Sequence, residues 1–161
     1  MKKLLLMTLV MSLPLIVFTS CSKDDEPAEQ TFFVNVYSKW ESGDESLVKD
    51  AFVYLFPNEN KSIDDQKSAI SVVSDGVMTY TDGSKSLAPK YATKFQSGVF
   101  NLENISNGEY ILWVTYKVAV GARFYSSYKK IDVNYDYRGT TEKKVFQTSM
   151  EDNGLYIYKK W

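Results

Sequence analysis

Short runs of β-branched and aromatic residues, separated by turn-forming residues, fill this chain from residue 31 onward. Val, Ile, Tyr, Phe and Trp favour the pleated backbone of a strand, whereas Gly, Asn, Asp, Ser and Pro favour turns. The pattern predicts strands over Thr31–Trp40, Val48–Phe56, Phe95–Leu102, Glu109–Val120, Arg123–Val133, Glu142–Thr148 and Leu155–Tyr158. About seven to eight strands at this spacing predict an all-β fold, a single antiparallel β-sandwich of the transthyretin-like or Ig-like kind.

The predicted strands alternate between two faces, as side chains on a pleated backbone do. In the first strand, Phe32, Val34 and Val36 share one face. The second strand turns apolar residues to both faces, with Ala51, Val53 and Leu55 on one and Phe52, Tyr54 and Phe56 on the other. These faces predict which side chains fill the core.

A long polar connection covers residues 58–92 and is less regular. Asp82–Gly83 follows Met78–Tyr80 and predicts a hairpin there. A short helix over Ser62–Val73 is also expected, with Ser62 as its cap and Ile63, Ile70 and Val73 on its apolar face.

The N-terminus has the order of a secretory signal: Lys2 and Lys3, then an apolar run from Leu4 to Phe18, then small residues before Cys21. A transmembrane helix needs about 20 apolar residues, and this run is shorter and contains Pro14. We therefore expect a signal peptide over residues 1–20. Lipid attached to Cys21 would tether the protein to a membrane.

Two local resemblances refine this address. Phe18-Thr19-Ser20-Cys21 resembles the bacterial lipobox, in which the cysteine receives a diacylglyceryl group. Lys23, Asp24, Asp25 and Glu26 resemble the acidic export tag of Bacteroidetes-type surface lipoproteins. The resemblance implies an outer-membrane, lipid-anchored protein that faces the cell exterior. The alternative for residues 21–30 is a flexible solvated tether, and both interpretations can hold together. The folded domain would then span residues 31–161.

Composition limits the functions that this chain can have. It contains no histidine and a single cysteine, so Ser-His-Asp catalysis, most zinc sites and a disulfide are ruled out. Its formal net charge is −1 and its basic residues form no stripe, which argues against nucleic acid as a partner. We expect no catalytic residues and no cofactor. Paired carboxylates for glycoside cleavage stay conceivable, with Asp64, Asp65, Asp75, Asp82 and Glu103 as candidates, but a sandwich of this size has little depth for that cleft.

Three stretches resemble the transthyretin-like sandwiches that include carboxypeptidase regulatory domains and collagen-adhesin B repeats. Lys49–Phe56 is similar to their second strand, Gly98–Ile105 to their glycine-led central strand, and Asn107–Val114 to the strand that follows. Asp50 departs from the pattern, because the family often has glycine there. The resemblance implies a fold and leaves the function open.

A calcium site is suggested by Asp132, Asn134 and Asp136, which alternate along one strand face. An EF-hand loop would continue with glycine at its sixth position and glutamate at its twelfth. This chain has Tyr137 and Lys143 at those positions. The favoured interpretation is a solvated strand face, and no metal site is predicted.

Two tryptophans are candidate ligand-facing aromatics. Trp113 alternates against Leu112 and Val114 and is expected on the outer face of its sheet; Trp40 ends the first strand. Exposed tryptophan can stack on sugar rings, because both present apolar faces with polar edges. The favoured alternative for Trp113 is that the long connection or the C-terminal segment covers it.

We therefore expect a non-catalytic cell-surface binding module for a glycan or protein ligand, with its oligomeric state open. The alternative is a structural, adhesin or pilus-type subunit, in which the segment Gly154–Trp161 would donate or accept a strand. The simpler expectation is that this segment completes a sheet.

Overall fold

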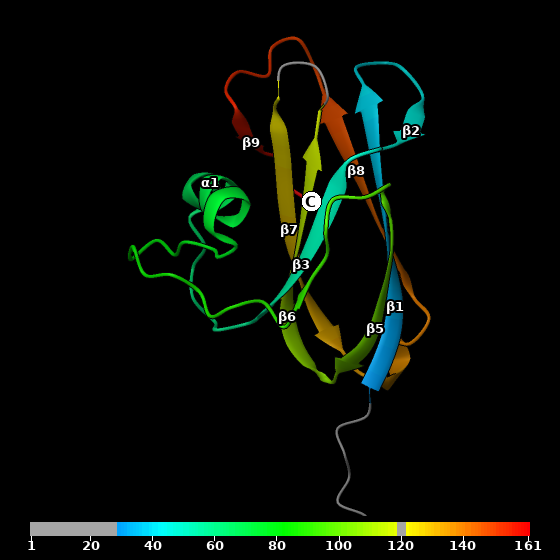
Figure 1. Ribbon diagram of the computed structural model, residues 1–161, viewed down its shortest axis with the longest axis vertical. Coiled ribbons are helices and arrows are strands. Elements are labelled where there is room, and N and C mark those ends of the chain that lie inside the picture. The colour runs from blue at the N-terminus through cyan, green and yellow to red at the C-terminus, as the bar shows by residue number, and fades with distance from the viewer. Residues whose placement is uncertain (1–28, 119–121) are drawn as a thin grey trace, which may run out of the picture.

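The computed structural model describes residues 29–118 and 122–161, which form two sheets, one α-helix and one 3-10 helix (Figure 1). The strands are β1 (Glu29–Trp40), β2 (Glu45–Leu47), β3 (Ala51–Pro57), β4 (Tyr91–Ala92), β5 (Val99–Ser106), β6 (Gly108–Lys117), β7 (Phe124–Val133), β8 (Thr141–Thr148) and β9 (Tyr156–Tyr158). The helices are α1 (Asp65–Asp75) and η1 (Tyr135–Tyr137). Cys21 and the tag residues Lys23, Asp24, Asp25 and Glu26 lie outside the described residues. No helix within the described ranges is long and apolar enough to cross a bilayer.

The two sheets pack face to face around one large apolar cluster, which we call the main core. In the first sheet β1 is central, with β2 and β5 along one side and β8 along the other. The second sheet has the order β4-β3-β6-β7-β9. Phe32, Val34 and Val36 enter the main core from β1, which confirms the predicted inward face. Ala51, Val53 and Leu55 meet them from β3.

The sheets are mixed, which corrects the expected all-antiparallel sandwich. β1 pairs in parallel with β8, and β7 pairs in parallel with β9. The chain crosses from the second sheet to the first after β7 and returns after β8. The chain reverses direction between β7 and β8 and again between β8 and β9. β8 therefore runs in the same direction as β1, and β9 in the same direction as β7. Sequence alternation reports which face is buried but carries no information about the neighbouring strand.

β3 and β6 are buried on both faces, because a second apolar cluster covers the outer side of their sheet. This outer core contains Phe52 and Phe56 from β3, Ile111 and Trp113 from β6, and Val72 from α1. The two apolar faces predicted for Val48–Phe56 thus belong to two different cores. Figure 1 shows α1 and the green connection around it on that side of the sheet.

The helix begins later than predicted, and the predicted apolar face is only partly right, because Ile63 and Val73 pack against the outer core but Ile70 does not. Asp64, not Ser62, is the N-cap, and its carboxylate accepts a hydrogen bond of 3.0 Å from the Lys67 amide. The expected apolar residue Ile70 is exposed, whereas Ser68 and Ser71 are buried. Their hydroxyls donate to the backbone carbonyls of residues 79 and 77, each at 2.8 Å. Buried serine is tolerated here because the adjoining hairpin supplies partners, which periodicity alone cannot reveal.

Most of the predicted strands are present, with shifted ends. The Asp82–Gly83 turn also forms, because Thr79 and Lys85 pair as an isolated antiparallel bridge. The short strands β2 and β4 are additions to the prediction. The segment Gly154–Trp161 contributes β9 to the second sheet, as the simpler expectation held.

Candidate functional site

A pocket of about 480 Å³ opens between the two sheets at one end of the sandwich. We call it the end pocket. It has the size of many small-ligand sites. Its lining residues come from both sheets: Ser38, Trp40, Tyr116, Val118, Arg123, Tyr125 and Thr148.

The directions of β1, β6, β7 and β8 place the lining residues at the same end of the sandwich. β1 and β8 are parallel, and their register places Trp40 opposite Thr148 where both strands finish. β6 and β7 are antiparallel, and their register places Tyr116 opposite Tyr125 near the end of one strand and the start of the other. In Figure 1 the arrowheads of β1, β6 and β8 and the start of β7 all lie at the upper end. The pocket is thus built from strand ends, which the rest of both sheets holds in place.

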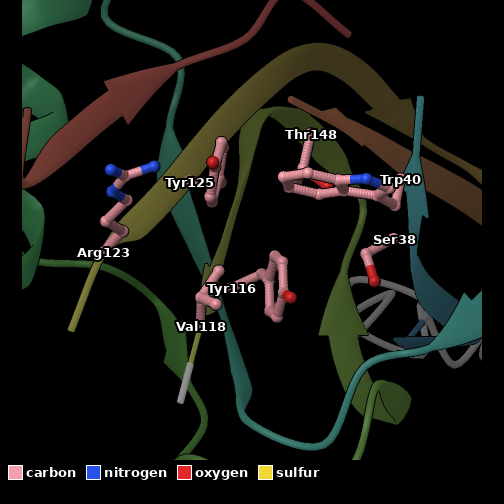
Figure 2. Close-up of a pocket in the computed structure, with 7 residues that line it drawn as sticks. All are labelled: Ser38, Trp40, Tyr116, Val118, Arg123, Tyr125 and Thr148. Atoms are coloured by element: carbon pink, nitrogen blue, oxygen red, sulfur yellow. The ribbon is translucent and has the colours of Figure 1, made fainter. Parts of the chain in front are cut away.

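Three aromatic rings form the apolar part of the pocket. Trp40 is 49% exposed. The ring of Tyr116 stacks on that of Tyr125, with centroids 5.9 Å apart and planes at 21°. Tyr116 also packs on Phe146 of the main core, at 6.0 Å. Figure 2 shows the two tyrosine rings between Trp40 on one side and Arg123 on the other.

Polar groups surround these rings. The Tyr125 hydroxyl donates to Oδ2 of Asp152 at 3.2 Å, and the Arg123 guanidinium is close enough to act on Tyr125 electrostatically. Burial and the nearby Asp152 charge raise the pKa of Tyr125, which outweighs the opposite effect of Arg123. The Thr148 hydroxyl donates to the Lys39 carbonyl at 3.3 Å. The pocket therefore presents the phenol hydroxyls of Tyr116 and Tyr125, the aliphatic hydroxyls of Ser38 and Thr148, and one guanidinium.

Among the described residues that line the pocket, none is a carboxylate or a lysine. The carboxylates considered for glycoside cleavage lie elsewhere. Asp64 caps α1, Asp65 and Asp75 belong to that helix, Asp82 hydrogen-bonds to Ser84 in the hairpin, and Glu103 lies on β5. Aromatic faces combined with a few hydrogen-bonding groups suit the binding of a saccharide or another ring-containing polar ligand.

Trp113 is not a ligand-facing residue, and this part of the prediction is wrong. Its side chain does point away from the main core, as the alternation predicted, but its exposed fraction is 0%. The ring stacks on Tyr128 at 5.6 Å, and its Nε1 donates to Oγ1 of Thr115 at 3.0 Å. Helix α1 and the hairpin residues Met78 and Tyr80 pack over this face, and the Tyr158 ring of β9 lies 6.4 Å from that of Trp113. The favoured alternative, that the long connection or the C-terminal segment covers Trp113, is confirmed.

Trp40 is partly exposed, as predicted, and it lines the end pocket. Sequence reasoning missed its partners. Tyr116 is in phase with Leu112 and Val114, which is an inward position. A tyrosine in an inward position at the end of a strand was the available signal, because the core thins there and the hydroxyl can reach water.

A second hollow, of about 360 Å³, lies where β3 ends and β6 begins. Its lining is polar apart from Ile131: Asn58, Asn60, Glu109, Lys130, Ile131 and Asp132. Nearby, Asn134 is the N-cap of η1, and its side-chain oxygen accepts from the Asp136 amide at 3.0 Å. Its amide nitrogen donates to Asp132 at 3.3 Å. Among residues 29–118 and 122–161, no group of three or more His, Cys, Asp or Glu residues is placed to hold a metal ion.

Comparison with known proteins adds little. No protein family model matches the sequence, and neither does any curated protein. One similar solved structure is described as a "putative carbohydrate binding protein" from Pseudomonas aeruginosa. The two share 14% identity over 74% of this chain and 88% of the other, with a TM-score of 0.36. A likeness of this size supports no inference about function.

Proposed function

We propose that this protein is a non-catalytic surface module that binds a saccharide in the end pocket. The half-exposed indole of Trp40, which lines a pocket together with Tyr116 and Tyr125, is the observation that carries the proposal. Of the tryptophans within the described residues, Trp113 is buried and Trp161 partly buried, so Trp40 is the one with a half-exposed ring. Apolar ring faces lose water favourably when a sugar ring stacks on them.

The polar groups of the pocket support a saccharide over a purely apolar ligand. Hydroxyl groups of Ser38 and Thr148 lie on the Trp40 side, and the Tyr125 hydroxyl lies on the other. A sugar presents hydroxyls around the edge of an apolar ring face, so it can satisfy these groups while it stacks. The Thr148 and Tyr125 hydroxyls already donate to the Lys39 carbonyl and to Asp152. Each can still accept a hydrogen bond from a sugar hydroxyl, which a hydrocarbon cannot supply.

The setting that we propose for this module is the outer membrane, with lipid on Cys21 and the acidic tag Lys23–Glu26 directing the chain to the cell exterior. The signal-like N-terminus supports this part. The domain is proposed to be transthyretin-like, on the three stretches that resemble that family. A tether and a binding pocket together suit a protein that captures ligand at a surface.

The test is a binding screen of the full chain in a detergent that lacks a sugar headgroup. A panel of host and microbial glycans is applied to the wild type, to Trp40→Ala and to Phe33→Ala. Phe33 is the matched control, because it is an exposed aromatic on the same strand but outside the pocket. We expect Trp40→Ala to weaken binding at least tenfold, by analogy with stacking contributions of about 1–3 kcal/mol per ring.

Phe33→Ala is expected to bind as the wild type does. Equal losses in both variants would mean that the end pocket is not the site. If no glycan binds the wild type, the saccharide proposal fails, and protein partners become the next class to test.

A further inference from the structure

We infer that the end pocket selects acidic saccharides, with a sugar carboxylate bound by Arg123. This inference rests on the proposed saccharide function and specifies the chemical class of the ligand. Of the seven side chains that line the pocket, Arg123 is the one with a formal charge at neutral pH. It lies at the opposite side of the two tyrosine rings from Trp40 (Figure 2).

The charge of Arg123 is not neutralised by the part of the chain that the structure describes. No Asp or Glu among residues 29–118 and 122–161 forms an ion pair with it. The Arg123 guanidinium carries five N–H donors, more than its interaction with Tyr125 can use. Arg123 is partly buried and lines the pocket. A carboxylate ligand would satisfy both the donors and the charge.

Asp152, the acidic residue that hydrogen-bonds to Tyr125, already has other partners. Asp152 accepts the Tyr125 hydroxyl, forms an ion pair with Lys159 and accepts the Ser149 amide at 2.9 Å. These bonds lower the pKa of Asp152 despite its burial, so it stays ionised and paired with lysine. Asp152 therefore orients Tyr125 without neutralising Arg123. The arrangement leaves a positive group at the edge of an aromatic pocket.

The choice of arginine also bears on the ligand. Arg123 and Arg138 are the arginines of a chain that has 19 basic residues, and all the others are lysines. A guanidinium is planar and binds a carboxylate through two parallel hydrogen bonds, whereas an ammonium acts as a point charge. Uronic and sialic acids combine a stacking ring with a carboxylate. In this proposal the sugar ring stacks on Trp40 and Tyr116. Its carboxylate binds Arg123, on the far side of the tyrosine rings from Trp40.

The test compares matched pairs of ligands on the full chain in the same detergent. Each uronate- or sialate-containing oligosaccharide is paired with its own methyl ester, which keeps the sugar and removes the charge. Sulfated oligosaccharides and their desulfated forms make up a second set. We expect the wild type to bind the free acid at least tenfold more tightly than the ester. Rising salt should weaken only the acid.

Arg123→Gln keeps hydrogen-bonding capacity without charge, and Arg123→Lys keeps charge without the planar fork. We expect Gln to bind acid and ester equally and Lys to retain only part of the preference. Thermal unfolding of both variants checks that they fold. If the Arg123 variants do not fold, the comparison of acid and ester binding by the wild type tests the inference by itself.

Failure of the inference looks different from failure of the proposed function. If acid and ester bind wild type equally and Trp40→Ala abolishes both, the pocket binds saccharides and the acidic preference is refuted. If sulfated ligands bind and carboxylated ones do not, the carboxylate assignment is also overturned. If no saccharide of any kind binds, the proposed function and this inference fall together.

Discussion

Lys144 shows what a single buried charge does in this core. Its side chain is 4% exposed and points from β8 into the sandwich. Nζ donates to the Lys160 carbonyl at 2.7 Å and lies over the rings of Phe146, at 5.1 Å, and Trp161, at 5.6 Å. No carboxylate of the described residues pairs with it. Burial lowers the pKa of Lys144 to about 8 from its ordinary 10.5.

This pKa predicts an unusual pH dependence. Between pH 8 and 10.5 the folded state binds fewer protons at Lys144 than the unfolded state, so folding becomes more favourable as pH rises. Relative to Lys144→Met, the wild type should gain about 2 kcal/mol of unfolding free energy between pH 7 and 9.5. Urea denaturation at pH steps measures this difference. Lys143→Met is the control on the opposite face of the strand; its difference from wild type should stay flat. If the difference in unfolding free energy between wild type and Lys144→Met also does not change with pH, the lowered pKa of Lys144 is contradicted.

At the scale of elements, one glycine joins three segments of the first sheet. Gly98 lies just before β5, its carbonyl accepts from the Val36 amide at 2.6 Å, and its amide donates to the Val48 carbonyl at 2.9 Å. A Cβ atom at this position would lie 2.4 Å from the Val36 carbonyl oxygen and 2.8 Å from Cγ2 of Val48. The close approach of β1, β5 and the turn after β2 therefore requires glycine.

Gly98→Ala is expected to lower the free energy of unfolding by about 1–3 kcal/mol, because the backbone at Val36 has to move away. Chemical denaturation measures the loss. Ser97→Ala changes the exposed neighbouring side chain and should stay within about 0.5 kcal/mol of wild type. Equal stability of Gly98→Ala and wild type would show that β1 and β5 are less tightly joined than described.

For the whole molecule, the last residues join parts that lie far apart in the sequence. β9 pairs with β7, and the Lys159 amide donates to the Ser126 carbonyl at 2.8 Å. The Tyr156 carbonyl accepts from Gln66 of α1 at 3.0 Å. Trp161 packs against the main core, with the ammonium groups of Lys129 and Lys144 each 5.6 Å from its ring. This segment thus binds the second sheet, the helix and the main core together.

Deletion of residues 156–161 should cost about 3–5 kcal/mol, because buried Ile157 and the packing of Trp161 are lost together. Thermal unfolding and size-exclusion chromatography are measured side by side. Trp161→Ala should give a smaller loss in the same direction. A truncated chain of unchanged stability that no longer assembles would instead favour the structural-subunit alternative for Gly154–Trp161.

Within the described residues, the sequence by itself determined most strands and the side of each strand that meets the main core. Strand propensity and alternation are local properties, so Phe32, Val34 and Val36 could be placed inward without knowledge of their partners. The same alternation correctly set Trp113 on the face opposite Leu112.

The tertiary structure alone decided what covers each face, which strands are parallel and where the pocket lies. Trp113 became a core residue because α1 and the hairpin pack over it, and Ser68 became buried because the hairpin supplies its hydrogen-bond partner. Trp40, Tyr116 and Arg123 share a pocket because strands from two sheets end at the same level. Such contacts depend on the arrangement of segments distant in sequence, and a local pattern carries no information about that arrangement.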